Sequence, residues 1–301
     1  MLKRFSVELM SVVFVVSLSS IVFAQAPPGT DIYLVSLEET DAGGVMTGRP
    51  RNITSRPGYD NQPSFRQDGK AILYTCALGD GQTDIYAFDL FTNKSEPLTR
   101  TLESEYSPTP TPDGQHFSVI RVELDTSLVQ RLWQFPFSGE EPSLLIKNIN
   151  PVGYHAWADA KRLILFVLGQ PPTLQIAQVK KGSAKAKTIV SNGGRSLHKI
   201  PGREAFSFVH KVSDDEWWIK SVEAKSLKIE PLVKTLPKSE DYAWTPNGKI
   251  IMGQGSKLYY CDPNESDGFT EIADFERGGL KNISRLAVSP NGDLIAIVAA
   301  E

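Results

Sequence analysis

A tight-turn signal that recurs at a nearly constant interval constrains this chain more than any other feature. Gly69 and Gly114 are 45 residues apart. Gly202, Gly248 and Gly292 follow one another at spacings of 46 and 44 residues, and the gap of 88 between Gly114 and Gly202 leaves room for one more member. A fixed period of this length is typical of repeat architectures. The six turns are Asp68-Gly69, Asp113-Gly114, Asp159-Ala160, Pro201-Gly202, Asn247-Gly248 and Asn291-Gly292.

Each turn lies between two strand-like segments, as the stretch PSFRQDGKAILY at 63–74 illustrates. Asp68-Gly69 predicts a two-residue hairpin turn, which needs residues with positive φ. The run Ala71–Tyr74 is short and apolar, as in a buried strand. The other five turns are followed by similar apolar runs, at Phe117–Ile120, Leu163–Leu168, Ala205–Val209, Ile250–Met252 and Leu294–Val298.

Two further strands are expected after each hairpin. The third strand usually carries an aromatic residue, as at Asp84–Tyr86, Leu132–Trp133, Trp217–Ile219 and Leu258–Tyr260. The fourth strand is weaker and is expected near Pro97–Thr99, Ser143–Leu145, Thr188–Val190 and Pro231–Val233. Four antiparallel strands in every 40 to 50 residues are the signature of a β-propeller blade.

The two ends of the chain determine the number of blades. Thr30–Tyr33 is a copy of the third-strand sequence Thr83–Tyr86, and Asn52–Thr54 matches a fourth strand. The segment 280–301 holds a first and a second strand and then stops. We therefore expect the N-terminal strands, residues 30–54, to complete the blade that 280–301 begins, which also removes a free sheet edge.

These patterns predict an all-β fold, a six-bladed β-propeller of four-stranded antiparallel blades whose last blade is closed by N-terminal strands. No helix-period run of ten or more residues appears after the first two dozen residues. One blade cannot cover its own apolar faces, whereas a ring of blades stacks each on its neighbours. We expect residues 25–301 to form a single propeller domain.

The first 24 residues have the features of a secretory signal peptide. Lys3-Arg4 is basic, Val12–Leu18 is mostly apolar, and Val22-Phe23-Ala24 has the small residues of a cleavage site. A retained membrane helix is the weaker interpretation, because the apolar run is short and interrupted by serines. We expect a periplasmic or secreted protein without a membrane span after cleavage.

Charge and cysteine content indicate which partners and which disulfide bonds to expect. The formal net charge is −3, and this mildly acidic balance argues against a nucleic-acid partner. The densest basic group, Lys180-Lys181 with Lys185 and Lys187, fits a solvated hairpin tip. Cys76 and Cys261 lie in strand-like runs, and we interpret both as small core residues, with a single disulfide as the alternative.

The repeats resemble those of the TolB-like propeller family, which carries WD40-like (PD40) Asp-Gly repeats. The resemblance rests on Leu98-Thr99, on the stretch 63–70 and on its analogues Thr245–Gly248 and Ser289–Gly292. It covers essentially all of the chain after residue 24, and it implies six blades and a channel mouth that meets partners in the cell envelope. We expect no counterpart of the small α/β domain that precedes the TolB propeller, and no Gly-x-Ser-x-Gly motif of the related propeller-gated hydrolases is present in the sequence.

The candidate binding residues precede or enter the first strand of each blade, where propeller channels open. Polar residues that converge on a pocket are the default hypothesis for a site. Tyrosine and arginine also suit protein interfaces, although the same residues could simply solvate the mouth. The candidates are Asp60, Asn61, Glu105, Tyr106, Tyr154, His155, Arg195, His198, Asp241, Tyr242 and Arg285.

The repeat residues are structural, so they indicate a fold and not a reaction. We expect a monomeric module that binds a protein or peptide partner in the cell envelope, with no cofactor and no catalytic residue. The alternative is a metal- or carboxylate-assisted hydrolase or lyase that acts on a small or carbohydrate ligand in the channel. In that case Asp60, Glu105 and Asp241 could hold a Ca²⁺ ion, whereas His155 and His198 alone are too few for a zinc site.

Overall fold

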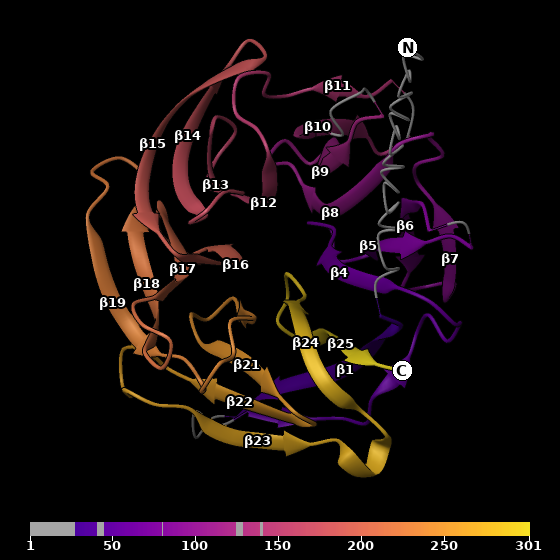
Figure 1. The fold of residues 1–301 in the computed structure, drawn as a ribbon. Coiled ribbons are helices and arrows are strands. Elements are labelled where there is room, and N and C mark those ends of the chain that lie inside the picture. The colour runs from indigo at the N-terminus through magenta and orange to yellow at the C-terminus, as the bar shows by residue number, and fades with distance from the viewer. Residues whose placement is uncertain (1–27, 41–44, 80, 125–128, 139–140) are drawn as a thin grey trace, which may run out of the picture.

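The described residues form six sheets arranged around a central axis, as the computed structural model shows (Figure 1). The structure describes residues 28–40, 45–79, 81–124, 129–138 and 141–301. The expected signal peptide, residues 1–24, lies outside these ranges. Five sheets have four strands, and the sixth has five because two short strands both pair with β1. All pairings within the sheets are antiparallel, so the all-β six-bladed propeller is confirmed.

Each blade is a row of strands that runs from the channel outward. The innermost strands are β4 (Asp60–Phe65), β8 (Ser104–Pro110), β12 (Val152–Trp157), β16 (Gly193–Lys199), β20 (Tyr242–Trp244) and β24 (Lys281–Val288). The second strands are β5 (Ala71–Ala77), β9 (His116–Val122), β13 (Arg162–Val167), β17 (Ala205–Lys211), β21 (Ile250–Gln254) and β25 (Leu294–Ala300).

The outer half of each blade follows the same order. The third strands are β6 (Thr83–Asp89), β10 (Gln130–Pro136), β14 (Thr173–Lys180), β18 (Trp217–Glu223), β22 (Lys257–Cys261) and β1 (Thr30–Glu39). The outermost strands are β7 (Lys94–Pro97), β11 (Ser143–Leu144), β15 (Ser183–Ser191), β19 (Ile229–Lys234) and β23 (Thr270–Asp274), with β2 (Val45–Thr47) and β3 (Arg51–Asn52) beside β1. A short 3₁₀ helix, Glu276–Gly278, precedes β24.

The repeated turn is longer than the two-residue turn that the sequence predicts. The N–H of Arg66, which follows β4, donates to the carbonyl of Ala71, the first residue of β5, so four residues lie between these two partners. Gly69 alone of the Asp-Gly pair has positive φ, at 68°. The Asp68 carboxylate instead accepts the Lys70 N–H, which is the usual role of aspartate in turns. The spacing of the glycines therefore predicted the blades correctly, whereas the predicted turn type was wrong.

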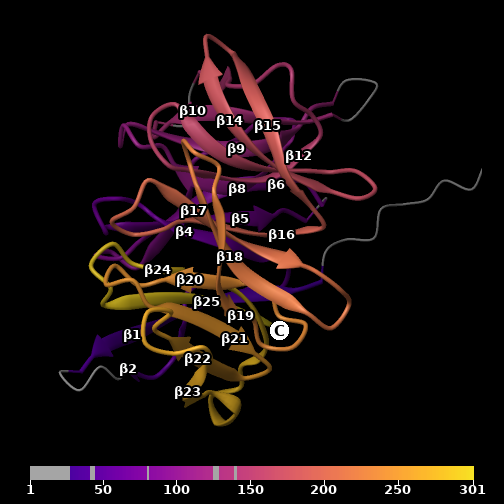
Figure 2. The same cartoon turned by 90° about the vertical axis from the view of Figure 1, so that its left-hand side faces the viewer.

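The N-terminal strand closes the ring, as the sequence predicts. β1 pairs with β25 from Thr30 opposite Ala300 to Ser36 opposite Leu294, and the two strands lie side by side in Figure 2. The copied sequence also reproduces a hydrogen-bond set. Thr99 donates to the Asp84 carboxylate and accepts the Ile85 N–H. In the closing blade the corresponding set joins Thr54, Asp31 and Ile32 at 2.8 and 3.0 Å.

The apolar core lies mainly between neighbouring blades. β5 is buried along its whole length, which explains why its sequence is apolar except for Thr75. β1 buries both of its faces: Ile32 and Leu34 pack with the blade of β4, and Val35 and Leu37 pack with the blade of β20. Cys76 and Cys261 are buried free thiols, so no disulfide joins them. The four lysines of the β14–β15 hairpin are exposed, in agreement with a solvated tip.

Bulges interrupt five of the six innermost strands. The register shifts in β4, β8, β12, β16 and β24, and Gln62 and Ser107 take positive φ at two of these shifts. A bulge bends a strand and redirects its side chains. These shifts therefore determine which residues face the channel. Among the described residues no helix is long and apolar enough to cross a membrane.

Candidate functional site

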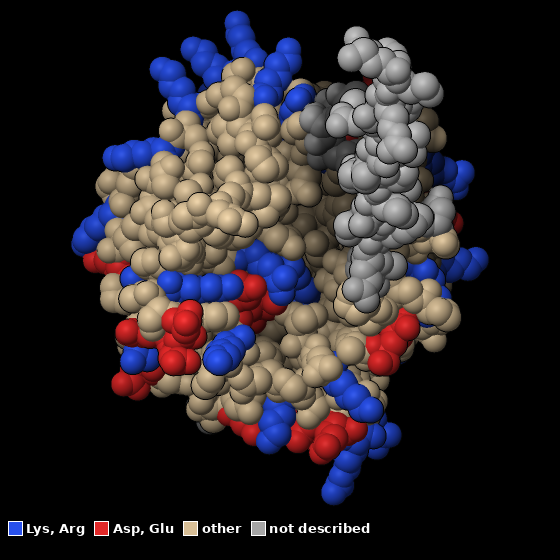
Figure 3. All heavy atoms as spheres, viewed as in Figure 1, with Lys and Arg blue, Asp and Glu red and all other residues tan. Residues whose placement is uncertain are grey.

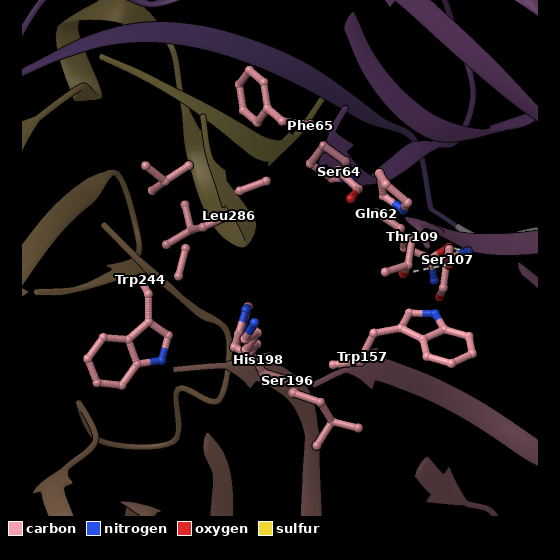
Figure 4. Close-up of a pocket in the computed structure, with 18 of the residues that line it drawn as sticks. Gln62, Ser64, Phe65, Ser107, Thr109, Trp157, Ser196, His198, Trp244 and Leu286 are labelled. Atoms are coloured by element: carbon pink, nitrogen blue, oxygen red, sulfur yellow. Dashed lines mark hydrogen bonds between the residues drawn. The ribbon is translucent and has the colours of Figure 1, made fainter. Parts of the chain in front are cut away.

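A cavity of about 850 Å³ occupies the central channel and takes its walls from the innermost strands of all six blades (Figure 4). Ser64, Ser107 and Thr109 contribute small polar side chains on one side, and Trp157, His198 and Trp244 surround the rest. Because each strand alternates its side chains, only part of each innermost strand reaches this space.

Four side chains form a hydrogen-bonded and ion-paired group where the innermost strands begin; we call it the constriction cluster. It consists of Tyr154, Arg195, Asp241 and Arg285, and all four line the cavity. Asp241 lies between the two arginines, with Arg285 at 3.2 Å and Arg195 at 3.4 Å. Arg285 also donates to the Tyr154 hydroxyl at 3.0 Å, and its guanidinium carbon lies 4.8 Å from the centre of that ring. The cluster joins blades that are far apart in sequence.

Further charges surround the constriction cluster. Glu240 binds both Arg195, at 3.0 Å, and Lys211, at 2.9 Å. Burial raises the pKa of Asp241 against the opposing effect of Arg285 and Arg195. Figure 3 shows basic and acidic side chains side by side near the hollowed centre of the face in view. The channel therefore has one charged end, whereas most of the remaining lining is neutral.

Tyr59, just before β4, also belongs to the surroundings of the cluster. Burial raises the pKa of its hydroxyl, and the charges of Arg285 and Arg195 oppose that shift. Tyr154 and Tyr106 also raise the pKa of the Tyr59 hydroxyl. Tyr59 and Tyr154 thus lie within electrostatic range of Arg285, and Tyr59 keeps its proton and remains a hydrogen-bond donor at neutral pH.

Two buried serines form hydrogen bonds with residues of the channel wall. Ser118 of β9 accepts the indole N–H of Trp157 at 2.9 Å and contacts Nε2 of His155 at 2.6 Å. Ser207 of β17 repeats this arrangement with Trp244 and Tyr242. Each serine belongs to the blade before the aromatic residues that it binds. These contacts cross the blade interface and fix the orientation of the wall.

The two channel histidines are neutral. Burial lowers the pKa of His155 to about 3, and its Nδ1 has no hydrogen-bond partner among the described residues. Burial lowers the pKa of His198 to about 4, and the positive charge of Arg285 adds to that effect. His198 contacts the Ser196 hydroxyl at 3.0 Å and packs on the Tyr242 ring at 4.5 Å. Both imidazoles can therefore offer a neutral donor or acceptor to a ligand.

The structure brings seven of the eleven predicted residues to the cavity. Tyr154, His155, Arg195, His198, Asp241, Tyr242 and Arg285 line it, although His155 and Tyr242 are more than nine-tenths buried. Asp60, Asn61, Glu105 and Tyr106 do not line it.

The four predicted residues outside the cavity have structural surroundings instead. Asp60 pairs with Arg56 at 2.6 Å, and Asn61 donates to the Thr30 hydroxyl at 3.2 Å. Glu105, fully buried, lies 3.2 Å from Arg121. Tyr106 packs against the core between the second and third blades.

The carboxylates that could hold a Ca²⁺ ion in the enzyme alternative do not fit such a site. Asp60, Glu105 and Asp241 are each paired with an arginine, which leaves few oxygen atoms for a metal ion. Within the described ranges no group of three or more His, Cys, Asp or Glu side chains could hold a metal ion. We therefore assign no metal role to these residues.

Several wall residues were missed. Ser196 lies two positions before His198, and the period of a strand could have placed both on one face. Trp157 and Trp244 pack with core clusters and also line the cavity. Ser118 gave no signal, because its partners come from the next blade.

Solved structures of similar fold include TolB propellers. A candidate TolB from Agrobacterium tumefaciens is 15% identical, with a TM-score of 0.69 over 91% of this chain and 99% of that one. TolB from Acinetobacter baumannii is 15% identical, with a TM-score of 0.55, and the match covers 91% of this chain but 64% of that one. A gluconolactonase from Xanthomonas campestris is 6% identical, with a TM-score of 0.62 over 92% and 99% of the two chains.

The comparison with protein-family models gives no match, and neither does the comparison with curated proteins. Identities of 6 to 15% to the solved structures show a common fold and no more. Proteins of this fold include both TolB and a gluconolactonase, so the fold alone does not distinguish binding from catalysis. The chain has the propeller fold that TolB-like proteins share.

Proposed function

We propose that this chain is a periplasmic or secreted binding propeller that takes up a segment of a protein or peptide partner in its central channel. The cavity of about 850 Å³ carries this proposal, because all six blades contribute to it and its polar groups are held in place. Ser118 and Ser207 fix wall residues from behind, and Arg285 joins Tyr154 and Asp241 across the ring. Fixed polar groups around an enclosed space are typical of binding sites. The signal-peptide pattern supports the location.

A pull-down from an envelope extract tests the proposal. We expect a partner that wild type retains and that the combined variant Tyr154→Ala, Arg195→Ala and Arg285→Ala does not. The control carries three alanines at Lys181, Lys185 and Lys187 of the exposed β14–β15 hairpin and retains the partner. Equal recovery with the channel variant and wild type would exclude the channel as the binding site.

A hydrolase or lyase remains the second candidate, and Asp241 is the observation that favours it. This carboxyl lines the cavity and burial raises its pKa, as in groups that donate a proton during catalysis. If the chain is such an enzyme, purified protein should turn over a lactone or an acidic oligosaccharide, and Asp241→Asn should abolish the turnover. Absence of turnover on both substrate classes would leave binding as the function.

A further inference from the structure

Arg285 uses only part of its hydrogen-bonding capacity. A guanidinium has five N–H donors. One contact goes to the Tyr154 hydroxyl and one to Asp241, and the other N–H groups have no partner among the described residues. The side chain is 15% exposed and lines the cavity. Arg285 is therefore a largely desolvated cation that still has donors to offer to a ligand.

The charges around the constriction cluster do not cancel. Arg195, Lys211 and Arg285 contribute three positive charges, and Glu240 and Asp241 contribute two negative ones. One positive charge is left over at this end of the channel. Arg285 is the least exposed of the three cations and shares the Asp241 carboxylate with Arg195, so a ligand with a single negative charge would balance the surplus there.

Hydroxyl groups lie near the same point. Tyr154 is in contact with Arg285, and Tyr59 lies within the electrostatic range of Arg285 and Arg195. Beyond the cluster the lining consists mainly of hydroxyl, proline and aromatic residues, and its one other charged residue, Lys199, is exposed. This lining matches a ligand whose remaining part is neutral.

We infer that the constriction cluster binds the C-terminal carboxylate of a peptide whose preceding residues are neutral and lie in the channel. A guanidinium matches a carboxylate because two parallel N–H groups can bind its two oxygens. One surplus positive charge balances a monoanion, whereas a phosphate dianion would leave a charge unbalanced. The inference rests on the proposed function and specifies which part of a partner enters the channel.

The test uses a mixture of hexapeptides of random neutral sequence, synthesised once with free C-terminal carboxylates and once as amides. The full chain is immobilised, and retained peptides are quantified by mass spectrometry. We expect the free acids to be enriched at least about tenfold over the amides, which corresponds to about 1.4 kcal/mol. N-acetylglycine should compete at millimolar concentration, and N-acetylglycinamide should not.

Variants connect the preference to the cluster. Arg285→Gln should abolish the preference for the free acid. Tyr154→Phe removes only the hydroxyl, retains the ring that packs 5.8 Å from Phe166 and should weaken the preference. The control is Arg203→Gln, an exposed arginine outside the cavity, which should behave as wild type. Far-UV circular dichroism checks the fold of each variant.

The outcomes separate the two proposals. Equal retention of acids and amides would overturn the carboxylate inference but would support peptide binding in the channel. Retention of neither mixture would overturn both. If galacturonic acid oligomers bind in an Arg285-dependent way and no peptide does, the peptide assignment is wrong.

Discussion

Removing the Ile32 side chain beyond Cβ tests whether the N-terminal strand is part of the cooperative core. Ile32 is fully buried and packs against the blade of β4. A substitution of isoleucine by alanine in a core costs about 2–5 kcal/mol through lost burial and cavity formation. For a domain of this size we expect Ile32→Ala to lower Tm by roughly 4–15 °C. The measurement is thermal and urea unfolding followed by circular dichroism.

Ile85→Ala is the matched control. Ile85 occupies the copied position in a complete blade and is also fully buried, and its N–H donates to a threonine hydroxyl as the N–H of Ile32 does. Both variants should unfold in one transition with similar losses. If Ile32→Ala keeps the wild-type Tm while Ile85→Ala is destabilised, or if a separate early transition appears, the N-terminal strand does not close the ring cooperatively.

Three further predictions concern buried polar groups. Burial raises the pKa of Glu105 to about 7, so the folded protein binds more protons than the unfolded chain between about pH 4.5 and 7. The stability of wild type therefore falls as pH rises through that interval, whereas Glu105→Gln has no proton to lose. Urea unfolding should show that the free energy of unfolding of Glu105→Gln, relative to that of wild type, increases from pH 4.5 to 7. The pKa values of His155 and His198 are lowered to about 3 and 4, so their NMR signals should show no titration between pH 5 and 8. In the unfolded chain both histidines titrate near pH 6.5, so the stability that they contribute is complete above about pH 6.5 and is lost as pH falls. Ser118→Ala and Ser207→Ala each leave two buried polar groups without this hydrogen-bond partner. Each unpaired group should lower the free energy of unfolding by about 1–3 kcal/mol in urea unfolding. A loss below about 0.5 kcal/mol would show that these serines do not stabilise the channel wall.

The sequence predicted the ring better than the site because its repeat signals are local. The turn glycines and the copied Thr30–Tyr33 segment each depend on neighbouring residues, and they gave the number of blades and the closure. The direction of the polar side chains at the strand starts depends on bulges and on contacts between blades. Asp60 and Glu105 stand nine residues before Gly69 and Gly114, and both turn away from the cavity to pair with an arginine. Asp241, which lines the cavity, stands seven residues before Gly248, so it occupies a different position in its repeat from the other two carboxylates.

One row of paired residues connects the strand that closes the ring with the constriction cluster. Arg285 of β24 lies opposite Val298 of β25, and Val298 lies opposite Ile32 of β1. Residues opposite each other in antiparallel strands place their side chains on the same face of the sheet. Ile32 packs toward the blade of β4, and Tyr59, which precedes β4, lies within electrostatic range of Arg285. The strand that closes the ring and the arginine of the channel therefore share one face of the same sheet, with β25 between them.

This arrangement predicts that loosening β1 exposes Arg285 before the protein unfolds. We expect phenylglyoxal, which modifies arginine, to react faster with Arg285 in Ile32→Ala than in wild type or Ile85→Ala, at a temperature well below each Tm. Peptide mapping by mass spectrometry measures the rate, and Arg203, already 43% exposed, is the internal reference. Equal Arg285 rates in all three proteins would show that the closing strand does not control the position of the channel arginine.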